Sequence, residues 1–392
     1  MTHAPSPSWD LPDFNTYPVQ HRAVRAETIG HGIAVTWDDG LRTEHHRFVL
    51  RENSPDPATT HPLSREQQLQ LTEIPPDLEI VGAEVDADGG VRVQWSTGPV
   101  AESVYHPGWL RAWAAETTPP NPLPDQVVWD ATLDLATVSF DGDAVLAGGD
   151  EFDRFLLAVH THGVALVRGL PVDEDMIERL PSMLGPVRTT NFGHVFDVRT
   201  KSAEVTSNAY TDLELPVHTD LDTREYMPGL QFLWCMVNDA TGGESRLSDA
   251  AAITRHLRSE HPEAYDALTT IPVSFINKAT DTDYRFVAPF LVVDDAGELV
   301  EARWSPWLRG PLQASIADAE RFYAGLRLAL QLGDDARFVV SHKLGAGDML
   351  AFDNRRVLHG RGPLDRSTGE RWLRGSYVER EELESRLRVR QR

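Results

Sequence analysis

Short runs in which apolar and polar residues alternate dominate the first part of the chain, and this pattern predicts β-strands. The runs lie at 32–37, 79–85 and 91–96. The glycine-containing turn at 86–90 joins the last two as a hairpin. Helical spacing is expected at 64–73, with Ser64 as the cap, and at 106–116.

Four prolines between 117 and 126 interrupt this pattern, so we interpret that segment as a linker. We therefore predict a small N-terminal α+β domain over residues 1–118 and a larger domain over residues 119–392.

The larger domain mixes many short strands with a few longer helices. Helices are expected at 152–163, from about Asp249 onward with a break at Pro262, and at 314–333. The strand-like runs lie at 163–170, 192–198, 229–237, 244–248, 272–276, 284–293, 335–341, 347–352 and 372–379. Because strands and helices do not alternate, a parallel βαβ sheet fits less well than a mainly β, jelly-roll-like double sheet decorated with helices.

Composition narrows the possible partners. The 392 residues carry 37 basic and 60 acidic side chains, a formal net charge of −23, which disfavours nucleic acid and anionic membranes as partners. The single cysteine, Cys235, excludes an intrachain disulfide and a cysteine-based zinc site. The amino terminus lacks the pattern of a secretory signal and no long apolar run is present, so we expect a cytoplasmic protein.

A candidate metal site begins with His218-Thr219-Asp220. Fifteen histidines and 60 acidic residues in 392 predict roughly two His-x-acid patterns by chance, and the sequence contains two. The other, at His261 and Glu263, lies in a polar helical stretch and is interpreted as a solvated surface. His218 and Asp220 lie in an extended segment, where residues two apart point to the same side. They are therefore placed to face one ion.

Two later residues complete a reactive set. His359 is the expected second histidine of a two-histidine, one-carboxylate triad, which binds non-haem iron with positions left open. Arg371 follows twelve residues later, and a guanidinium binds a carboxylate through two parallel hydrogen bonds. This combination suits 2-oxoglutarate as co-substrate. If the strands at 355–359 and 372–379 pair, His359 and Arg371 approach the same cavity.

Several motifs together carry a resemblance to a known family. These are "HTD" at 218–220, "GLQFL" at 229–233, "TGGES" at 241–245, "FDNRRVLHGR" at 352–361 and "RWLRGSY" at 371–377. The chain resembles the gamma-butyrobetaine and trimethyllysine dioxygenases over nearly its whole length. The resemblance implies a double-stranded β-helix (jelly-roll) catalytic core, Fe(II) as metal and 2-oxoglutarate as co-substrate.

The resemblance also implies roles for individual residues. His218, Asp220 and His359 would bind iron, and Arg371 with Ser245 would bind 2-oxoglutarate. Related halogenases lack the carboxylate, so Asp220 implies hydroxylation.

Members of the family hold a quaternary ammonium in an aromatic cage, in which ring faces attract the cation. The matching positions are Phe192, Phe196, Tyr210 and Tyr377. Trp304 and Trp307 lie in a segment that relatives use to reach the substrate, and the sequence does not place either of them.

One departure concerns the N-terminal domain. Relatives carry a zinc-binding cysteine cluster that is absent here, so no structural zinc is expected. We expect this domain to serve homodimer contacts or to cover the active site.

The function expected is hydroxylation of a small cationic substrate by O2, with gamma-butyrobetaine, converted to carnitine, as the first candidate. A specialised-metabolism substrate and a non-catalytic binding protein are the alternatives.

Overall fold

The computed structural model describes residues 9–117, 123–199, 214–278, 280 and 282–392. The chain divides into two compact units, one formed by residues 1–122 with 391–392 and the other by residues 123–390. Among the described residues, no helix combines the length and the apolar character that crossing a bilayer requires.

The N-terminal unit contains two antiparallel three-stranded sheets, β1-β2-β3 and β4-β5-β6. Their strands are β1 (Ala23–Ile29), β2 (Gly32–Trp37), β3 (Arg42–His46), β4 (Ile80–Val85), β5 (Val91–Trp95) and β6 (Glu102–Tyr105). Two short helices, α1 (Arg47–Glu52) and α2 (Pro107–Ala112), accompany them. The alternation of the strands buries Trp37, Val91, Val93 and Tyr105 in one core with Trp109 of α2.

The helix predicted at 64–73 is wrong. Only a single turn, η1 (Leu71–Glu73), forms at its end, and Thr60 pairs with Gln67 in an isolated bridge. Arg65 has a φ of 59°, a left-handed conformation that a right-handed helix cannot contain. The amide of Ser64 donates to Nδ1 of His61 at 3.0 Å, so Ser64 closes a turn instead of capping a helix.

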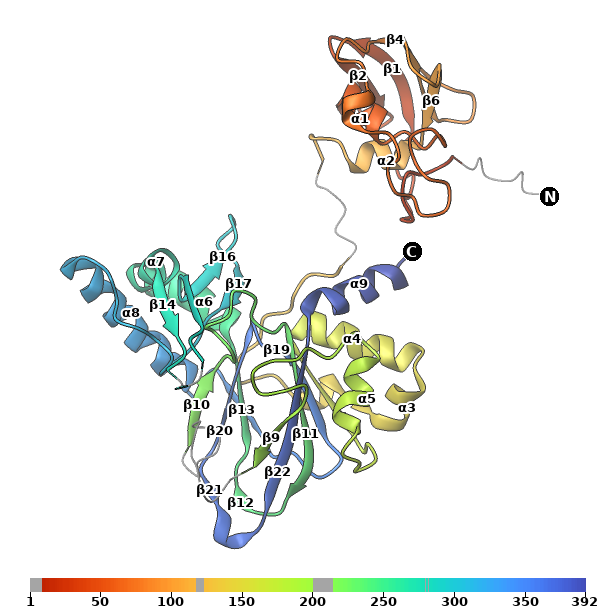
Figure 1. The fold of residues 1–392 in the computed structure, drawn as a ribbon. Helices are drawn as coiled ribbons and strands as arrows, with labels where there is room; N and C mark the ends of the chain where they lie inside the picture. The colour runs from red at the N-terminus through yellow and green to blue at the C-terminus, as the bar shows by residue number, and fades with distance from the viewer. Residues whose placement is uncertain (1–8, 118–122, 200–213, 279, 281) are drawn as a thin grey trace. The chain divides into compact units, whose positions relative to one another are not determined.

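The C-terminal unit contains two larger sheets (Figure 1). The six-stranded sheet consists, in order, of β7 (Ser139–Asp141), β8 (Val164–Arg168), β19 (Met349–Asp353), β11 (Leu230–Asn238), β22 (Arg371–Val378) and β9 (Phe196–Arg199). The four-stranded sheet consists, in order, of β10 (Leu215–His218), β20 (Val357–Arg361), β13 (Ser245–Asp249) and β18 (Val339–His342). Three strand pairs complete the unit: β12 (Thr241–Gly242) with β21 (Leu364–Asp365), β14 (Val273–Ile276) with β15 (Arg285–Ala288), and β16 (Leu291–Val293) with β17 (Leu299–Ala302).

Helices cover the outer faces of these sheets (Figure 1). Those beside the six-stranded sheet are α3 (Gly142–Ala147), α4 (Asp150–His162), α5 (Met176–Ser182) and α9 (Arg380–Arg390). Those beside the four-stranded sheet are α6 (Ala250–Glu260), α7 (Pro262–Thr270) and α8 (Ile316–Gly333). The 3-10 turn η2 (Leu135–Val138) directly precedes β7, and the 3-10 turn η4 (Arg366–Thr368) lies between β21 and β22. The predicted break at Pro262 is confirmed, because this proline opens α7 directly after α6 ends.

The strand alternation decides which side chains face the space between the two sheets. In β20, Leu358 packs with α6 and α8 in the outer core, whereas His359 faces Phe352 of β19, with ring centroids 4.8 Å apart. His359 is therefore an inward residue that crosses from the smaller sheet toward the larger one.

The strands at 355–359 and 372–379, whose pairing would bring His359 and Arg371 together, do not pair. β20 pairs with β10 and β13, whereas β22 pairs with β11 and β9. His359 and Arg371 therefore come from different sheets, and they approach one interior because the two sheets face each other.

Candidate active site

Three side chains converge at the end of β10. Asp220 Oδ1 lies 3.4 Å from His218 Nε2, and Asp220 Oδ2 lies 3.6 Å from His359 Nε2. All three ligand atoms lie within 4.8 Å of one another. β10 ends at His218, so Asp220 lies just beyond the strand and reaches the same centre through the turn that follows. The sequence thus identified three residues that the fold brings together.

The donor set fits a divalent transition metal of the non-haem iron type. Metal–ligand bonds of roughly 2.1 Å place neighbouring ligands of an octahedron about 3 Å apart, so these imidazole–carboxylate separations need to close by only about half an ångström. His218 Nδ1 lies 3.0 Å from the carbonyl oxygen of Pro216, which orients Nε2 toward the centre. Both imidazoles are buried, so bulk water has little access to their nitrogens.

The ionisation of the three groups also favours a cation. Burial alone would raise the pKa of Asp220, but His359 and His218 outweigh burial and hold that pKa well below its usual range. Burial and the neighbouring His218 both lower the pKa of His359. For His218, burial lowers the pKa, but Asp220 more than compensates, so the pKa is raised. The centre therefore combines a charged carboxylate with at least one readily neutral imidazole.

Asp220 has a further partner that the sequence did not reveal. The hydroxyl of Tyr377, in β22, donates to Asp220 Oδ2 at 2.8 Å. This contact joins the six-stranded sheet to a candidate ligand held by the four-stranded sheet.

A cavity of about 120 Å³ is lined by two of the three candidate ligands, His218 and Asp220. Phe192, Phe196 and Tyr377, three of the four predicted cage residues, line it. Phe196 stacks on Tyr377 with ring centroids 5.2 Å apart, and Phe192 lies 6.0 Å from Phe196. Tyr210, the fourth, lies outside the described residues.

The two tryptophans that the sequence could not place have different positions. Trp307 lines the cavity, with its ring centroid 5.2 Å from that of His218. Trp304 is fully buried and packs against Phe290 in the core beside α6 and α8. Only Trp307 is therefore a further candidate for substrate contact.

Arg371 lies in a buried, positively charged environment. Burial and the nearby Arg361 lower its pKa to about 10. Arg371 Nε is buried without a hydrogen-bond partner among the described residues. A buried guanidinium nitrogen without a partner is costly unless a ligand accepts a hydrogen bond from it. This environment suits a carboxylate ligand.

Ser245 lies on the same rung of the four-stranded sheet as Arg361, which is its partner in the register of β13 and β20. Ser245 is buried, so its hydroxyl faces the protein interior rather than bulk solvent. Sequence reasoning overlooked Arg361, although its position two residues after His359 places both side chains on the same face of β20.

Comparison with known proteins is consistent with this geometry. Residues 121–377 match the family described as "Taurine catabolism dioxygenase TauD, TfdA family". Residues 24–111 match the family described as "Gamma-butyrobetaine hydroxylase-like, N-terminal".

Individual relatives align over almost the entire chain. A gamma-butyrobetaine dioxygenase from Pseudomonas sp. (strain AK-1) is 39% identical over 97% of this chain and 100% of its own length. A trimethyllysine dioxygenase from Meyerozyma guilliermondii is 25% identical over 95% of this chain and 96% of its own length. The human gamma-butyrobetaine dioxygenase is 25% identical over 92% of this chain and 94% of its own length.

Proposed function

Because this chain belongs to the TauD/TfdA family of dioxygenases, with the N-terminal domain of the gamma-butyrobetaine hydroxylase-like group, we propose that it hydroxylates gamma-butyrobetaine to carnitine. The chain is a 2-oxoglutarate-dependent dioxygenase, with Fe(II) and 2-oxoglutarate as its cofactor and co-substrate. The observation that carries the substrate proposal is the aromatic wall of Phe192, Phe196 and Tyr377 beside the His218, Asp220 and His359 centre.

The roles of the residues follow from their positions. His218, Asp220 and His359 are proposed to hold the iron, because their three ligand atoms converge in a buried site. Bound ferrous iron and 2-oxoglutarate together supply the activation of O2 for oxygen insertion into a C–H bond. Asp220 would supply one of the iron ligands, which favours hydroxylation over halogenation.

The remaining residues are proposed to position the two organic molecules. Arg371, with Ser245, binds a carboxylate of 2-oxoglutarate, which accepts hydrogen bonds from the buried Arg371 guanidinium, whose Nε has no partner among the described residues. The ring faces of Phe192, Phe196 and Tyr377 attract a trimethylammonium group, which needs no hydrogen-bond donor or acceptor. The pocket thereby fixes the distance between the cation and the iron, and with it the C–H bond that reacts.

The finer architectural expectations also remain proposals. We propose that the two facing sheets form a double-stranded β-helix, and that residues 1–118 form a zinc-free accessory domain, since the first 234 residues contain no cysteine. We also propose a homodimer and a cytoplasmic location. Sedimentation of the purified protein, elemental analysis for zinc and fractionation of the source cells test them.

The substrate proposal is tested with the full-length protein, Fe(II), 2-oxoglutarate and O2. Gamma-butyrobetaine, trimethyllysine and a neutral analogue with tert-butyl in place of trimethylammonium are compared. Stoichiometric succinate and carnitine from gamma-butyrobetaine alone support the proposal. Stimulation by none of the cations rejects it and favours a specialised-metabolism substrate.

A paired substitution then tests the cage. Phe196→Leu keeps the apolar bulk and removes a ring face, so binding of the cation should weaken by roughly 0.5–2 kcal/mol and binding of the tert-butyl analogue by much less. Phe140→Leu is the matched control, because Phe140 lies in β7 at the opposite edge of the same sheet. An equal loss of affinity for both ligands would show that these aromatic residues act only through hydrophobic packing.

A further inference from the structure

The loop that follows β10 is held by side chains that donate to its backbone. Between Asp220 and Pro228, seven carbonyl oxygens accept hydrogen bonds from four side chains. The acceptors are Asp220, Asp222, Arg224, Glu225, Tyr226, Met227 and Pro228, and the donors are Asn354, Arg303, Arg188 and Arg355. An exposed loop between two strands does not need such support, since water satisfies its carbonyls.

Asn354 holds the peptide groups on both sides of the candidate ligand. Its Oδ1 accepts from the amide of Asp220 at 2.8 Å, and its Nδ2 donates to the carbonyl of Asp220 at 3.0 Å. The same Nδ2 lies 3.3 Å from the carbonyl of Pro228, which ties the end of the loop to its start. Asn354 is fully buried, and a primary amide offers a donor and an acceptor in this arrangement.

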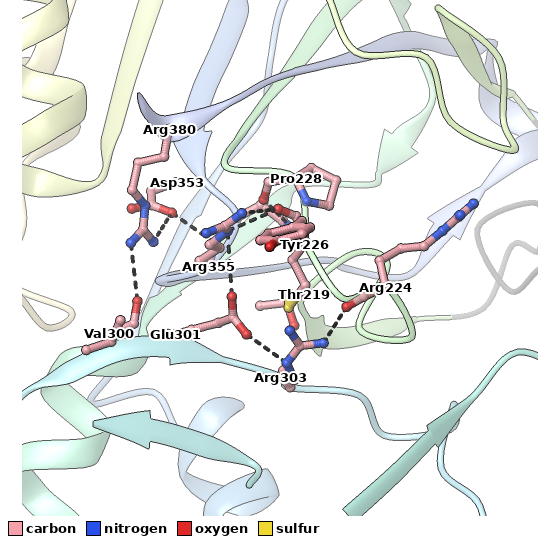
Figure 2. Close-up of polar contacts among 12 residues, drawn as sticks. Thr219, Arg224, Tyr226, Pro228, Val300, Glu301, Arg303, Asp353, Arg355 and Arg380 are labelled. Atoms are coloured by element: carbon pink, nitrogen blue, oxygen red, sulfur yellow. Dashed lines mark hydrogen bonds and ion pairs between the residues drawn. The ribbon is translucent and has the colours of Figure 1, made fainter. Parts of the chain in front are cut away.

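Arg303 holds the middle of the loop (Figure 2). Its guanidinium donates to the carbonyls of Asp222 and Arg224, each at 2.7 Å, and to that of Glu225 at 3.0 Å. Glu301 balances its charge through an ion pair of 2.7 Å and also pairs with Arg355 at 3.6 Å (Figure 2). The side chain of Arg303 is only 2% exposed, so both its charge and its hydrogen bonds are buried in the protein interior.

Leu221 shows what this support achieves. It follows Asp220, lines the cavity and has a φ of 62°, the left-handed region that branched residues rarely adopt. Such a conformation persists only where the surroundings hold it. The bonds of Asn354 to residue 220 and of Arg303 to residue 222 enclose Leu221 from both sides.

We propose that Asn354 is a positioning residue that fixes the Asp220 carboxylate for metal binding, with Arg303 as the support that keeps the following turn in place. This inference rests on the proposed assignment of His218, Asp220 and His359 as ligands. It adds that side chains outside the loop hold the backbone from Asp220 to Pro228.

A purely structural role is the competing explanation. Removing a buried hydrogen bond lowers the stability of the folded protein. Only a positioning role also changes the affinity of the folded protein for metal, because partners that orient ligands typically contribute about 10–100-fold in metal affinity.

The test measures Co(II) binding to metal-free, full-length protein by visible absorption. Asn354→Ala should raise the dissociation constant by about 10–100-fold, and Arg303→Lys, which keeps the charge but loses the fork, should raise it less. Ser248→Ala is the matched control: Ser248 is equally buried and donates to the carbonyl of Gly333 at 2.8 Å, away from the loop. It should lower the melting temperature and leave the dissociation constant within about threefold.

The outcomes separate this inference from the ligand assignment. Folded Asn354→Ala with an unchanged dissociation constant overturns the positioning role. If that variant does not fold, Asn354→Asp replaces it under the same criterion, because it keeps the side-chain volume and loses the donor to two carbonyls. His359→Ala must abolish tight Co(II) binding, and its failure to do so overturns the ligand set instead.

Discussion

Replacing Tyr377 by phenylalanine separates two roles that this residue combines. Its ring stacks on Phe196 with centroids 5.2 Å apart, and its hydroxyl donates to Asp220 Oδ2 at 2.8 Å. Tyr377→Phe removes only the hydroxyl. A hydrogen bond to a charged group contributes about 1.5–3 kcal/mol, which is roughly 10–150-fold in a binding constant. The Asp220 side chain is 24% exposed, so water can replace part of the bond, and we expect a loss near tenfold.

The assay compares two ligands in one variant. Co(II) titration of the metal-free protein should show the loss of roughly tenfold, whereas anaerobic binding of a trimethylammonium substrate to the loaded enzyme should change less than about twofold, because the ring remains. Tyr377→Leu serves as the companion, since it removes the ring and the hydroxyl together and should weaken both. The reasoning is refuted if Tyr377→Phe binds Co(II) as the wild type does and loses affinity for the substrate.

Three further predictions concern other parts of the chain. Arg371→Lys should raise the Michaelis constant for 2-oxoglutarate about 10–100-fold, because lysine cannot make the two parallel hydrogen bonds of the guanidinium, while the affinity for Co(II) stays unchanged. An unchanged Michaelis constant would show that another residue binds the carboxylate of 2-oxoglutarate. Burial lowers the pKa of His45 to about 4, although Glu116 opposes this shift. The contribution of the neutral His45 to the free energy of unfolding is therefore complete above pH 6.5 and falls by roughly 3 kcal/mol as the pH drops toward 4. Urea unfolding of His45→Gln should lack this pH dependence and otherwise match the wild type. Asp249→Ala should cost about 3–5 kcal/mol in the same assay, since Arg356, 2.7 Å away, would stay buried without its counter-charge; a loss below about 1 kcal/mol would show that water reaches it.

The elements that the sequence predicted well are those whose signal is local. The run at 229–237 forms β11, and the helix expected at 314–333 forms α8, because apolar spacing at each place matches the period of one element. The candidate metal ligands could be predicted from the sequence for the same reason, since two of them lie only two residues apart. Position in a sheet is not local. The pairing of β20 and β22 could not be decided from the sequence, because nothing in either strand indicates which of the two facing sheets it joins.

The aromatic lining of the cavity was predicted in part for a different reason. Phe192, Phe196 and Tyr377 are aromatic positions that the resemblance identified, and the structure places them on one cavity. Trp304 and Trp307 lie three residues apart in one segment, yet only Trp307 reaches the cavity. That segment is irregular and has no side-chain period, so the direction of each indole depends on the turn between them.

The support of the loop after Asp220 is the part of the site that sequence reasoning could not reach. A metal ligand is recognised by its residue type, but Asn354 and Arg303 act on backbone carbonyls, which every residue has. The sequence therefore does not identify these acceptors, and it does not distinguish the donors from other asparagine and arginine residues.

Two residues hold Asp220 in place: Tyr377 bonds to its carboxylate oxygen, and Asn354 bonds to its peptide groups. If each acts independently, the metal affinity lost in the double variant Tyr377→Phe, Asn354→Ala should equal the sum of the single losses in free energy. A smaller combined loss would show that both hold one rotamer of Asp220, so that once either is removed the carboxylate is already released.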